Sequence, residues 1–264
     1  MRLPRPLMLL AALLLMAPSL ALACGASARN TPSGQPRIMR AAVGAEGVTI
    51  TFLGHASFLI ASPGGTTAAT DYSGDHPAPQ PPDLITMNRA HTTHWTANPD
   101  PRIAHVLPGW REDGKPAQHD VTVGDMRVRN VPTNIRGYGG GGTQTYGNSI
   151  FVFEAGGLCI AHLGHLHHLL TDDDLATLGR IDVVMAPMDG SWTLNRQDMG
   201  EVLDQLRPRL VLAMHYWDDR TIRRFAASVA DRYGLRWNPG PTITLTRANL
   251  PERPEILVLP GPHF

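Results

Sequence analysis

Short hydrophobic runs separated by glycine and proline dominate the chain between about residues 47 and 162. Runs rich in β-branched and aromatic residues predict strands, and turn sequences such as Pro63-Gly64-Gly65 separate them. The expected strands are 48–53, 57–61, 66–70, 84–87, 104–107, 118–123, 127–131, 149–154 and 158–162.

From Thr171 onward the apolar positions take a helical spacing. Thr171 followed by Asp172, Asp173 and Asp174 is typical of a helix start, because the acids lie at the positive end of the helix dipole. Helices are expected from Thr171, over about 195–206 and over 219–233, alternating with strands 182–186, 210–214 and a last strand at 242–246. Strands followed by alternating helices and strands predict an α/β fold with two mixed sheets and helices outside.

The first 23 residues resemble a secretory signal. Two arginines precede an apolar run from Leu7 to Ala17, and small residues follow before Cys24. The run is shorter than the roughly 20 residues that span a bilayer. We therefore expect a signal peptide (1–23), a flexible linker (24–42) rich in glycine, proline and serine, and one domain (43–264). An exported, periplasmic protein is expected.

The two cysteines leave several alternatives open. Leu20-Ala21-Leu22-Ala23-Cys24 resembles a lipobox, in which Cys24 carries a lipid anchor, and it also fits ordinary signal cleavage. Cys159 lies in an apolar segment, so we expect a buried, inert thiol, with a Cys24–Cys159 disulfide as the alternative in an oxidising compartment. The membrane is expected as a partner only through such an anchor.

The charge of the chain argues against nucleic acid as a partner. The 23 basic and 23 acidic residues balance, and no basic run is present. A small-molecule substrate is therefore the expected partner, and the oligomeric state is not indicated.

Histidines gather at predicted strand ends or in the loops that follow, where metal and active sites are usually built. They occur in four segments: Gly54-His55-Ala56-Ser57, His91-Thr92-Thr93-His94, His162-Leu163-Gly164-His165-Leu166-His167-His168 and Met214-His215-Tyr216.

In this order and spacing the segments resemble the metallo-β-lactamase superfamily, and most closely its branch similar to ascorbate-6-phosphate lactonase and related zinc-dependent hydrolases. The resemblance runs from about Val48 to Phe225. It implies a four-layer αββα sandwich with a metal site at the edges of the sheets.

The metal ligands depart from the family pattern His-x-His-x-Asp-His, which here reads Arg89-Ala90-His91-Thr92-Thr93-His94. Arginine has no lone pair to offer, and a threonine hydroxyl is a poor zinc ligand. Where the family has a histidine after the central strand this chain has Asn134, and where it has a bridging aspartate this chain has His165.

A two-zinc site is therefore not expected. We predict one divalent transition metal, zinc before iron or manganese, held by His91, His94, His165 and His215. The alternative is a decayed site in which the histidines bond to one another and to nearby backbone. His55 is expected to line the pocket, and His167 and His168 to face solvent or cap a helix.

Asp71 and Arg89 are the predicted catalytic residues. Asp71 is expected to orient a histidine and, secondarily, to act as a general base. Arg89 is expected to grip an anionic group of the substrate, or to form a salt bridge with Asp71. A metal held by neutral histidines beside Arg89 predicts an electropositive pocket.

The predicted function is hydrolysis of a small, anionic lactone, ester, amide or phosphoester through a metal-bound hydroxide. Two alternatives remain at this point: a non-catalytic lipoprotein that binds metal or anions, and an iron-dependent oxidoreductase on the same fold.

Overall fold

The computed structural model describes Cys24 and residues 47–137 and 142–262. The expected signal peptide, all of the expected linker except Cys24, and most of the glycine cluster at 137–142 lie outside the described residues.

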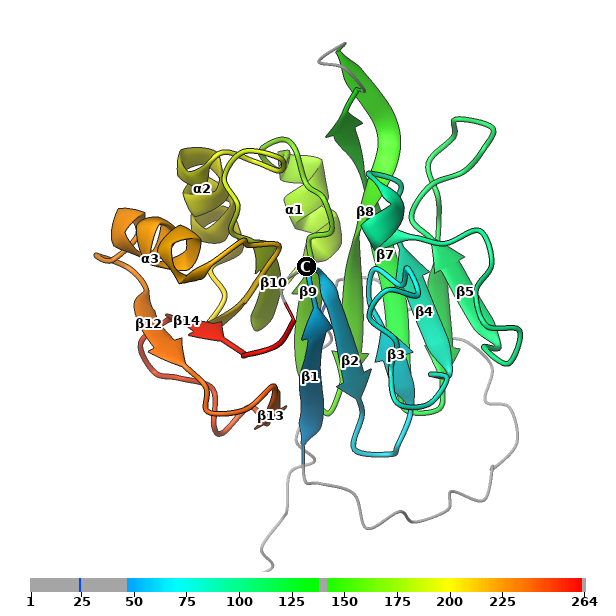
Figure 1. Cartoon of the computed structure of the whole chain (residues 1–264), viewed down its shortest axis with the longest axis horizontal. Coiled ribbons are helices and arrows are strands. Elements are labelled where there is room, and N and C mark those ends of the chain that lie inside the picture. Colours follow the sequence, from blue (N-terminus) through cyan, green and yellow to red (C-terminus); the bar gives the residue numbers. More distant parts are fainter. Residues whose placement is uncertain (1–23, 25–46, 138–141, 263–264) are drawn as a thin grey trace, which may run out of the picture.

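Two β-sheets pack face to face (Figure 1). One has six strands in the order β13-β1-β2-β3-β4-β5, and the other has eight in the order β12-β14-β11-β10-β9-β8-β7-β6. The strands are β1 (Val48–Gly54), β2 (Ser57–Ala61), β3 (Thr67–Ala69), β4 (Leu84–Met87), β5 (His105–Pro108), β6 (Asp120–Val123), β7 (Met126–Arg136), β8 (Thr143–Ala155), β9 (Leu158–His162), β10 (Val183–Pro187), β11 (Leu210–Met214), β12 (Gly234–Trp237), β13 (Thr242–Leu245) and β14 (Glu255–Val258).

The helices begin where the sequence supplies a capping side chain. They are α1 (Asp172–Leu178), α2 (Arg196–Leu206), α3 (Asp219–Ser228) and the short 3-10 helix η1 (Thr92–His94). Thr171 and Asp174 form a capping box at α1, while the side chains of Asn195 and Asp218 accept backbone N–H groups at the starts of α2 and α3. Each cap satisfies a donor that the first helical turn leaves open.

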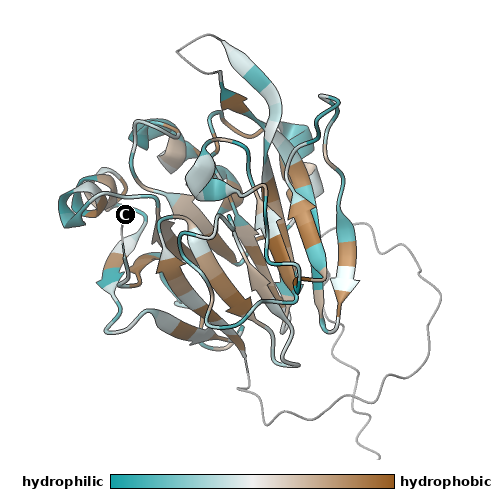
Figure 2. Ribbon diagram, turned by 45° about the vertical axis from the view of Figure 1, so that its right-hand side comes forward, coloured by the Kyte–Doolittle hydropathy of each residue, from teal (hydrophilic) through white to brown (hydrophobic). Residues whose placement is uncertain are grey.

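Hydrophobic side chains fill two main layers. The strands that carry many of them are coloured brown in Figure 2. One layer lies between the sheets and includes Phe58, Phe151 and Phe153. The other lies between the outer face of the eight-stranded sheet and the α-helices, and includes Val184 of β10 and Phe225 of α3. Burial of this kind, at about 25 cal/mol per Å² of apolar surface, is the main force that holds sheets and helices together.

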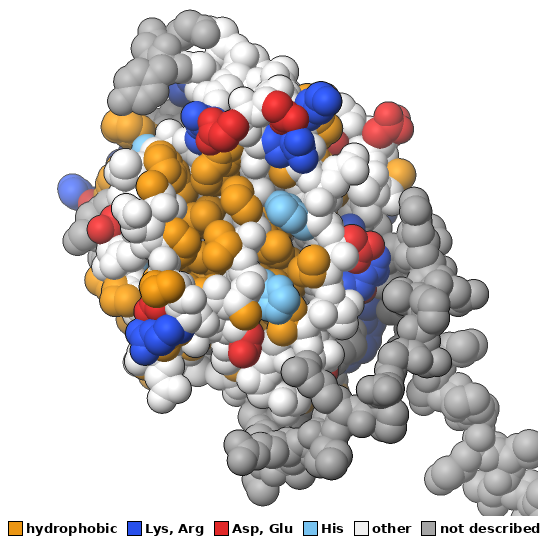
Figure 3. All heavy atoms as spheres, turned by 90° about the vertical axis from the view of Figure 1, so that its right-hand side faces the viewer, with side chains coloured by type: hydrophobic (Ala, Val, Ile, Leu, Met, Phe, Trp, Pro, Cys, Tyr) orange, Lys and Arg blue, Asp and Glu red, His pale blue; other side chains and the backbone are white. Residues whose placement is uncertain are grey.

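The α/β sandwich of the metallo-β-lactamase type is confirmed, with one difference in its outer layers. All three α-helices of the described residues pack on the eight-stranded sheet. On the other sheet a small cluster around Ile85 and Met87 is covered by Tyr72, Trp95 and Trp110, which come from loops. Figure 3 shows that hydrophobic side chains remain at the surface on this side of the molecule.

The end of the chain differs from the sequence prediction. The helix expected over 219–233 ends at Ser228, because the chain turns after Val229 so that Tyr233 packs in the core and β12 begins at Gly234. The strand predicted at 242–246 is present as β13, but it is not the last one, since β14 follows and pairs with both β11 and β12. β14 is only four residues long, and its pairing with β11 and β12 is what makes these residues a strand.

Cys24 and Cys159 form a disulfide, so the expectation of a free buried thiol at Cys159 is wrong. The backbone N–H of Arg180 donates to the carbonyl of Cys24 at 2.9 Å and also holds Cys24 against the domain. The disulfide and a lipid anchor at Cys24 exclude each other, because the one sulfur atom can form only one such bond.

Removing the disulfide is expected to destabilise the protein. Cys159→Ser should lower the free energy of unfolding by about 2–4 kcal/mol, because the crosslink restricts the unfolded chain over a separation of 135 residues. Urea denaturation of oxidised, reduced and variant protein measures the change. The Cys24→Ser and double variants should match the single variant, and equal stability of all forms would contradict the prediction.

Among the described residues, none of the helices has the length and apolar character needed to cross a membrane.

Candidate metal centre

The ends of several strands from both sheets meet at one edge of the sandwich. Strands β3 and β4 run parallel, as do β9, β10 and β11, so within each group the carboxyl ends lie at the same edge. The segments that follow these strands carry polar side chains: Asp71 after β3, His91 and His94 after β4, His165 after β9, Asp189 after β10 and His215 after β11. Ligand sites of α/β proteins are commonly built at such edges.

Three residues at this edge have left-handed backbone conformations, which residues other than glycine rarely adopt. His55 follows β1 with φ of 52°, Asp71 has φ of 43° and His215 has φ of 50°. A bond from the backbone N–H of His215 to the carbonyl of His55, 2.8 Å long, joins the two sheets here. Left-handed conformations at residues other than glycine cost free energy and gather at functional sites. Three of the five such residues in the described chain lie at this edge, which points to it as a functional site.

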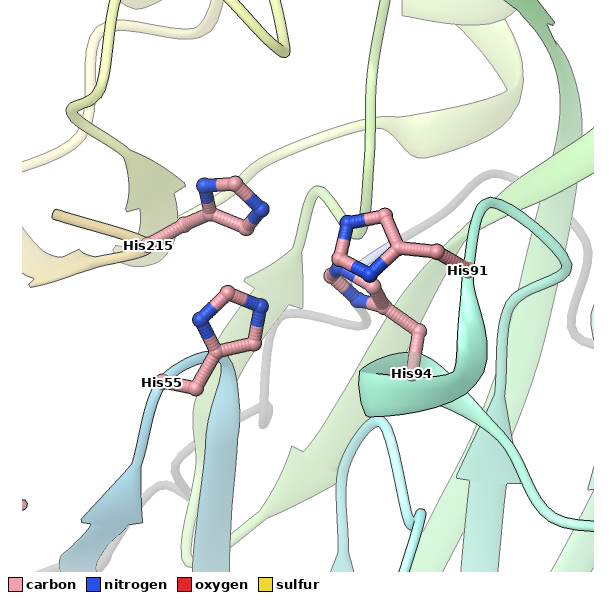
Figure 4. A group of neighbouring side chains, drawn as sticks. All are labelled: His55, His91, His94 and His215. Carbon is pink, nitrogen blue, oxygen red and sulfur yellow. The ribbon is translucent and has the colours of Figure 1, made fainter. Parts of the chain in front are cut away.

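Four imidazole groups point toward one another across the gap between the sheets (Figure 4). One ring nitrogen from each of His55, His91, His94 and His215 lies within 4.8 Å of the others. His55, His94 and His215 are buried and His91 is half-buried, so the cluster reaches the surface on the side of His91.

Each of two cluster histidines has a buried carboxylate at its Nδ1 atom. Nδ1 of His94 contacts Oδ2 of Asp71, and Nδ1 of His215 lies 3.2 Å from Oδ1 of Asp189. On both rings Nε2 is buried and has no hydrogen-bond partner among the described residues. A carboxylate at Nδ1 fixes the tautomer that leaves a lone pair on Nε2, which is the usual arrangement of a metal-bound histidine.

Burial keeps three of the cluster imidazoles, those of His55, His91 and His94, neutral. It lowers the pKa of His91 to about 4, and it lowers the pKa values of His55 and His94 well below the ordinary value, with neighbouring histidines adding to the effect. Burial also raises the pKa of Asp71, against the opposing effects of His162 and Asn88. A metal takes only the neutral form of imidazole, so these rings are ready to bind without losing protons.

His165 lies beside this group of four. Its Nε2 is 3.2 Å from Nε2 of His91, while its Nδ1 is 2.7 Å from Nε2 of His167. Two nitrogen ligands of one tetrahedral zinc, each about 2.0–2.1 Å from the metal, lie roughly 3.3 Å apart. The spacing of His91 and His165 therefore suits either a shared cation or a hydrogen bond. The residues present fit one transition metal with nitrogen ligands.

The ligands predicted from the sequence were His91, His94, His165 and His215. The structure places them close together and adds His55 to the group. His55 was expected only to line the pocket. Its position directly after a strand-ending glycine was the available signal.

Two buried asparagines hold the site, and sequence reasoning missed both. Asn88 donates to Oδ1 of Asp71 at 2.9 Å and accepts from the N–H of Ser149. The Oδ1 atom of Asn148 accepts from the N–H of His165 at 2.8 Å. No pattern in the sequence marks them, because asparagines that position a site look like any others in a loop or strand.

His162 has a structural position outside the metal cluster. Its Nε2 donates to the carbonyl of Ala56 at 2.8 Å, and its Nδ1 accepts from the N–H of Gly164. Both ring nitrogens are thus bonded to backbone. Thr93, which replaces an aspartate of the family motif, places its hydroxyl 2.8 Å from Nδ1 of His91 and so orients that ring.

Arg89 is turned toward the surface. Its guanidinium donates to Glu112 at 2.9 Å and lies 6.0 Å from the centre of the Trp110 ring, so the expected salt bridge with Asp71 is wrong. With Arg89 engaged there, and with Asp71 and Asp189 against the histidines, a divalent metal would be largely balanced in charge. The structure does not support the electropositive pocket expected from the sequence.

Arg89→Met should therefore have little effect on catalysis. We expect kcat and KM for anionic esters to change by less than about twofold, because an exposed ion pair contributes little and the guanidinium is already bound to Glu112. Steady-state kinetics of the purified variant measure this. A KM raised tenfold for anionic substrates alone would restore Arg89 to the binding site.

The comparisons with known proteins agree with this architecture. The family model described as "Beta-lactamase superfamily domain" matches residues 49–215. This range runs from β1 to the last cluster histidine. The chain therefore belongs to the β-lactamase superfamily domain family.

Among its relatives is a protein of Opitutus terrae named UPF0173 metal-dependent hydrolase. It is 30% identical over 228 residues, which cover 74% of this chain and 98% of the relative. A protein of Thermococcus kodakarensis with the same description is 26% identical over 200 residues, covering 64% of this chain and 84% of the relative.

Solved structures share the fold. One, from Thermotoga maritima and described as a Zn-dependent hydrolase of the metallo-β-lactamase superfamily, has a TM-score of 0.58 at 24% identity, covering 80% of this chain and 98% of that one. Another is CmlA, a diiron β-hydroxylase of Streptomyces venezuelae, with a TM-score of 0.58 at 15% identity, covering 76% of this chain and 54% of that one.

Proposed function

We propose that the protein is a metal-dependent hydrolase of small molecules whose single metal is held by the histidine cluster. The observation that carries the proposal is the pair of carboxylate-bound histidines, His94 with Asp71 and His215 with Asp189, whose Nε2 atoms are buried without partners in the described structure. Unsatisfied buried nitrogens are costly, and a metal ion would satisfy them. The family and the names of its relatives support the assignment.

The residues of the chain have distinct roles in this proposal. His55, His91, His94 and His215 would hold the metal, with His165 as a further nitrogen on the side of His91. When bound, the metal supplies a Lewis acid that activates water for attack on a lactone, ester, amide or phosphoester. Asp71 and Asp189 hold the tautomer and orientation of their histidines. Asp71 is buried behind His94, which favours an orienting role over that of a general base.

Zinc is proposed ahead of iron or manganese, because an all-imidazole site suits zinc and lacks the carboxylate oxygen ligands that manganese prefers. Metal analysis of protein purified without chelators tests this directly. Stoichiometric zinc with turnover of lactone, ester or phosphoester substrates is the expected result. Stoichiometric iron with oxygen consumption would favour the oxidoreductase, and absence of metal after reconstitution would overturn the hydrolase proposal.

We also propose export to an oxidising compartment such as the periplasm, on the basis of the signal-like segment 1–23 and the Cys24–Cys159 disulfide. Intact mass spectrometry of protein from an exporting host tests it. A chain that begins at Cys24 and lacks two hydrogens relative to its reduced form is expected. A lipid-sized mass on Cys24 would mean that the protein is membrane-anchored and the disulfide absent.

A further inference from the structure

Two exposed tryptophans stand beside the metal centre. Trp192 is 61% exposed and Trp217 is 43% exposed, although indole rings are usually largely buried. Their ring centres are 6.2 Å apart with 66° between the planes. The ring centre of Trp217 also lies 6.1 Å from that of His215. An aromatic surface therefore continues outward from a proposed metal ligand.

The backbone that carries both indoles is held firmly. Asp189, which faces His215, also accepts the backbone N–H groups of Ser191 and Trp192. Trp217 directly precedes Asp218, the capping residue of α3. A backbone fixed in this way does not have to be ordered when a ligand packs on the rings, which favours binding.

A positive charge lies next to the same loop. The guanidinium of Arg136, at the exposed end of β7, donates to the carbonyls of Ser191 and Thr193 at 3.2 and 3.4 Å, on either side of Trp192. Arg136 also lines a cavity of about 240 Å³ together with His167, whose ring contacts His165 of the centre. The carbonyls it binds are neutral, so its charge remains available to an anion.

From these contacts we infer that Trp192, Trp217 and Arg136 form the substrate-binding rim of the metal centre, and that the substrate is an organic anion with a planar ring. The inference rests on the proposed hydrolase function and specifies its substrate class. A flat ring fits the corner between the two indoles, where it meets the face of one and the edge of the other. The anionic group lies toward Arg136, and the scissile group toward His215 and His91.

Two phosphonates that are not hydrolysed test the inference on the zinc-loaded protein. Benzylphosphonate carries a ring and methylphosphonate does not, so the difference between their dissociation constants, measured by calorimetry, isolates the ring. We expect benzylphosphonate to bind roughly tenfold more tightly. Trp192→Ala and Trp217→Ala should each remove most of this advantage and leave the affinity for methylphosphonate unchanged, and Trp192→Phe should retain it.

Trp237→Ala is the matched control. Trp237 is also exposed, at 37%, but it lies in β12 beneath Arg223 rather than at the centre. It should change neither affinity, whereas Arg136→Met should weaken both phosphonates several-fold. Equal affinity of the wild type for the two phosphonates would overturn the inference while leaving the hydrolase intact. Failure of the protein to bind any transition metal would overturn the proposed function and this inference with it.

Discussion

Alanine at His94 or His215 is expected to abolish metal binding and to reduce hydrolysis by roughly a thousandfold or more. Each substitution removes a nitrogen of the cluster and leaves a buried carboxylate, Asp71 or Asp189, facing an empty space. Metal content is measured by elemental analysis after dialysis, and turnover by steady-state kinetics at saturating substrate.

The chain offers two matched controls for this loss. His162 is as buried as His94, but both of its ring nitrogens are bonded to backbone. His162→Ala should therefore lower thermal stability and keep the metal. His105 is exposed at the start of β5, and its replacement by alanine should change neither the thermal stability nor the metal content. Retention of stoichiometric metal in both His94→Ala and His215→Ala would rule out the proposed centre.

Replacing the carboxylates should lower the affinity for the metal rather than the turnover rate of the metal-loaded enzyme. Asp71→Asn and Asp189→Asn are each expected to lower metal affinity by about 10–100-fold, because the amide no longer fixes the tautomer of His94 or His215. At saturating metal, kcat should return to within a few-fold of the wild-type value. Titration with a competing chelator gives the affinity, and kinetics over a range of metal concentrations give kcat.

Asp182→Asn separates this effect from general loss of stability. Asp182 is also buried, but it lies before β10, at the other end of the strand from Asp189, where it accepts the N–H of Cys159. Its substitution should lower the melting temperature without changing metal affinity. If kcat of Asp71→Asn stayed a hundredfold low at saturating metal, Asp71 would instead act as a general base.

Several parts of the fold followed from local sequence. The helix start at Thr171 could be predicted directly, because a cap is a contact between residues three positions apart. Strands β4 and β9 were also anticipated within a residue, since both are short apolar runs with clear boundaries. β14 was missed because its four residues become a strand only by pairing with β11 and β12.

The same division between local sequence and tertiary contacts applies to the metal centre. The sequence determined which residue types were available: the histidines after the strands, and the absence of lone pairs at Arg89 and of an acid at Thr93. Tertiary structure decided which of these residues meet. Asp189 comes within 3.2 Å of His215 only because neighbouring parallel strands end at one edge, and His55 reaches the cluster only because the two sheets face each other. Arg89, adjacent in sequence to the cluster, turns away because Glu112 and Trp110 lie on its outer side.

Spacing along the chain determines contacts over one or two turns, whereas contacts between strands depend on pairing and packing that no single segment specifies.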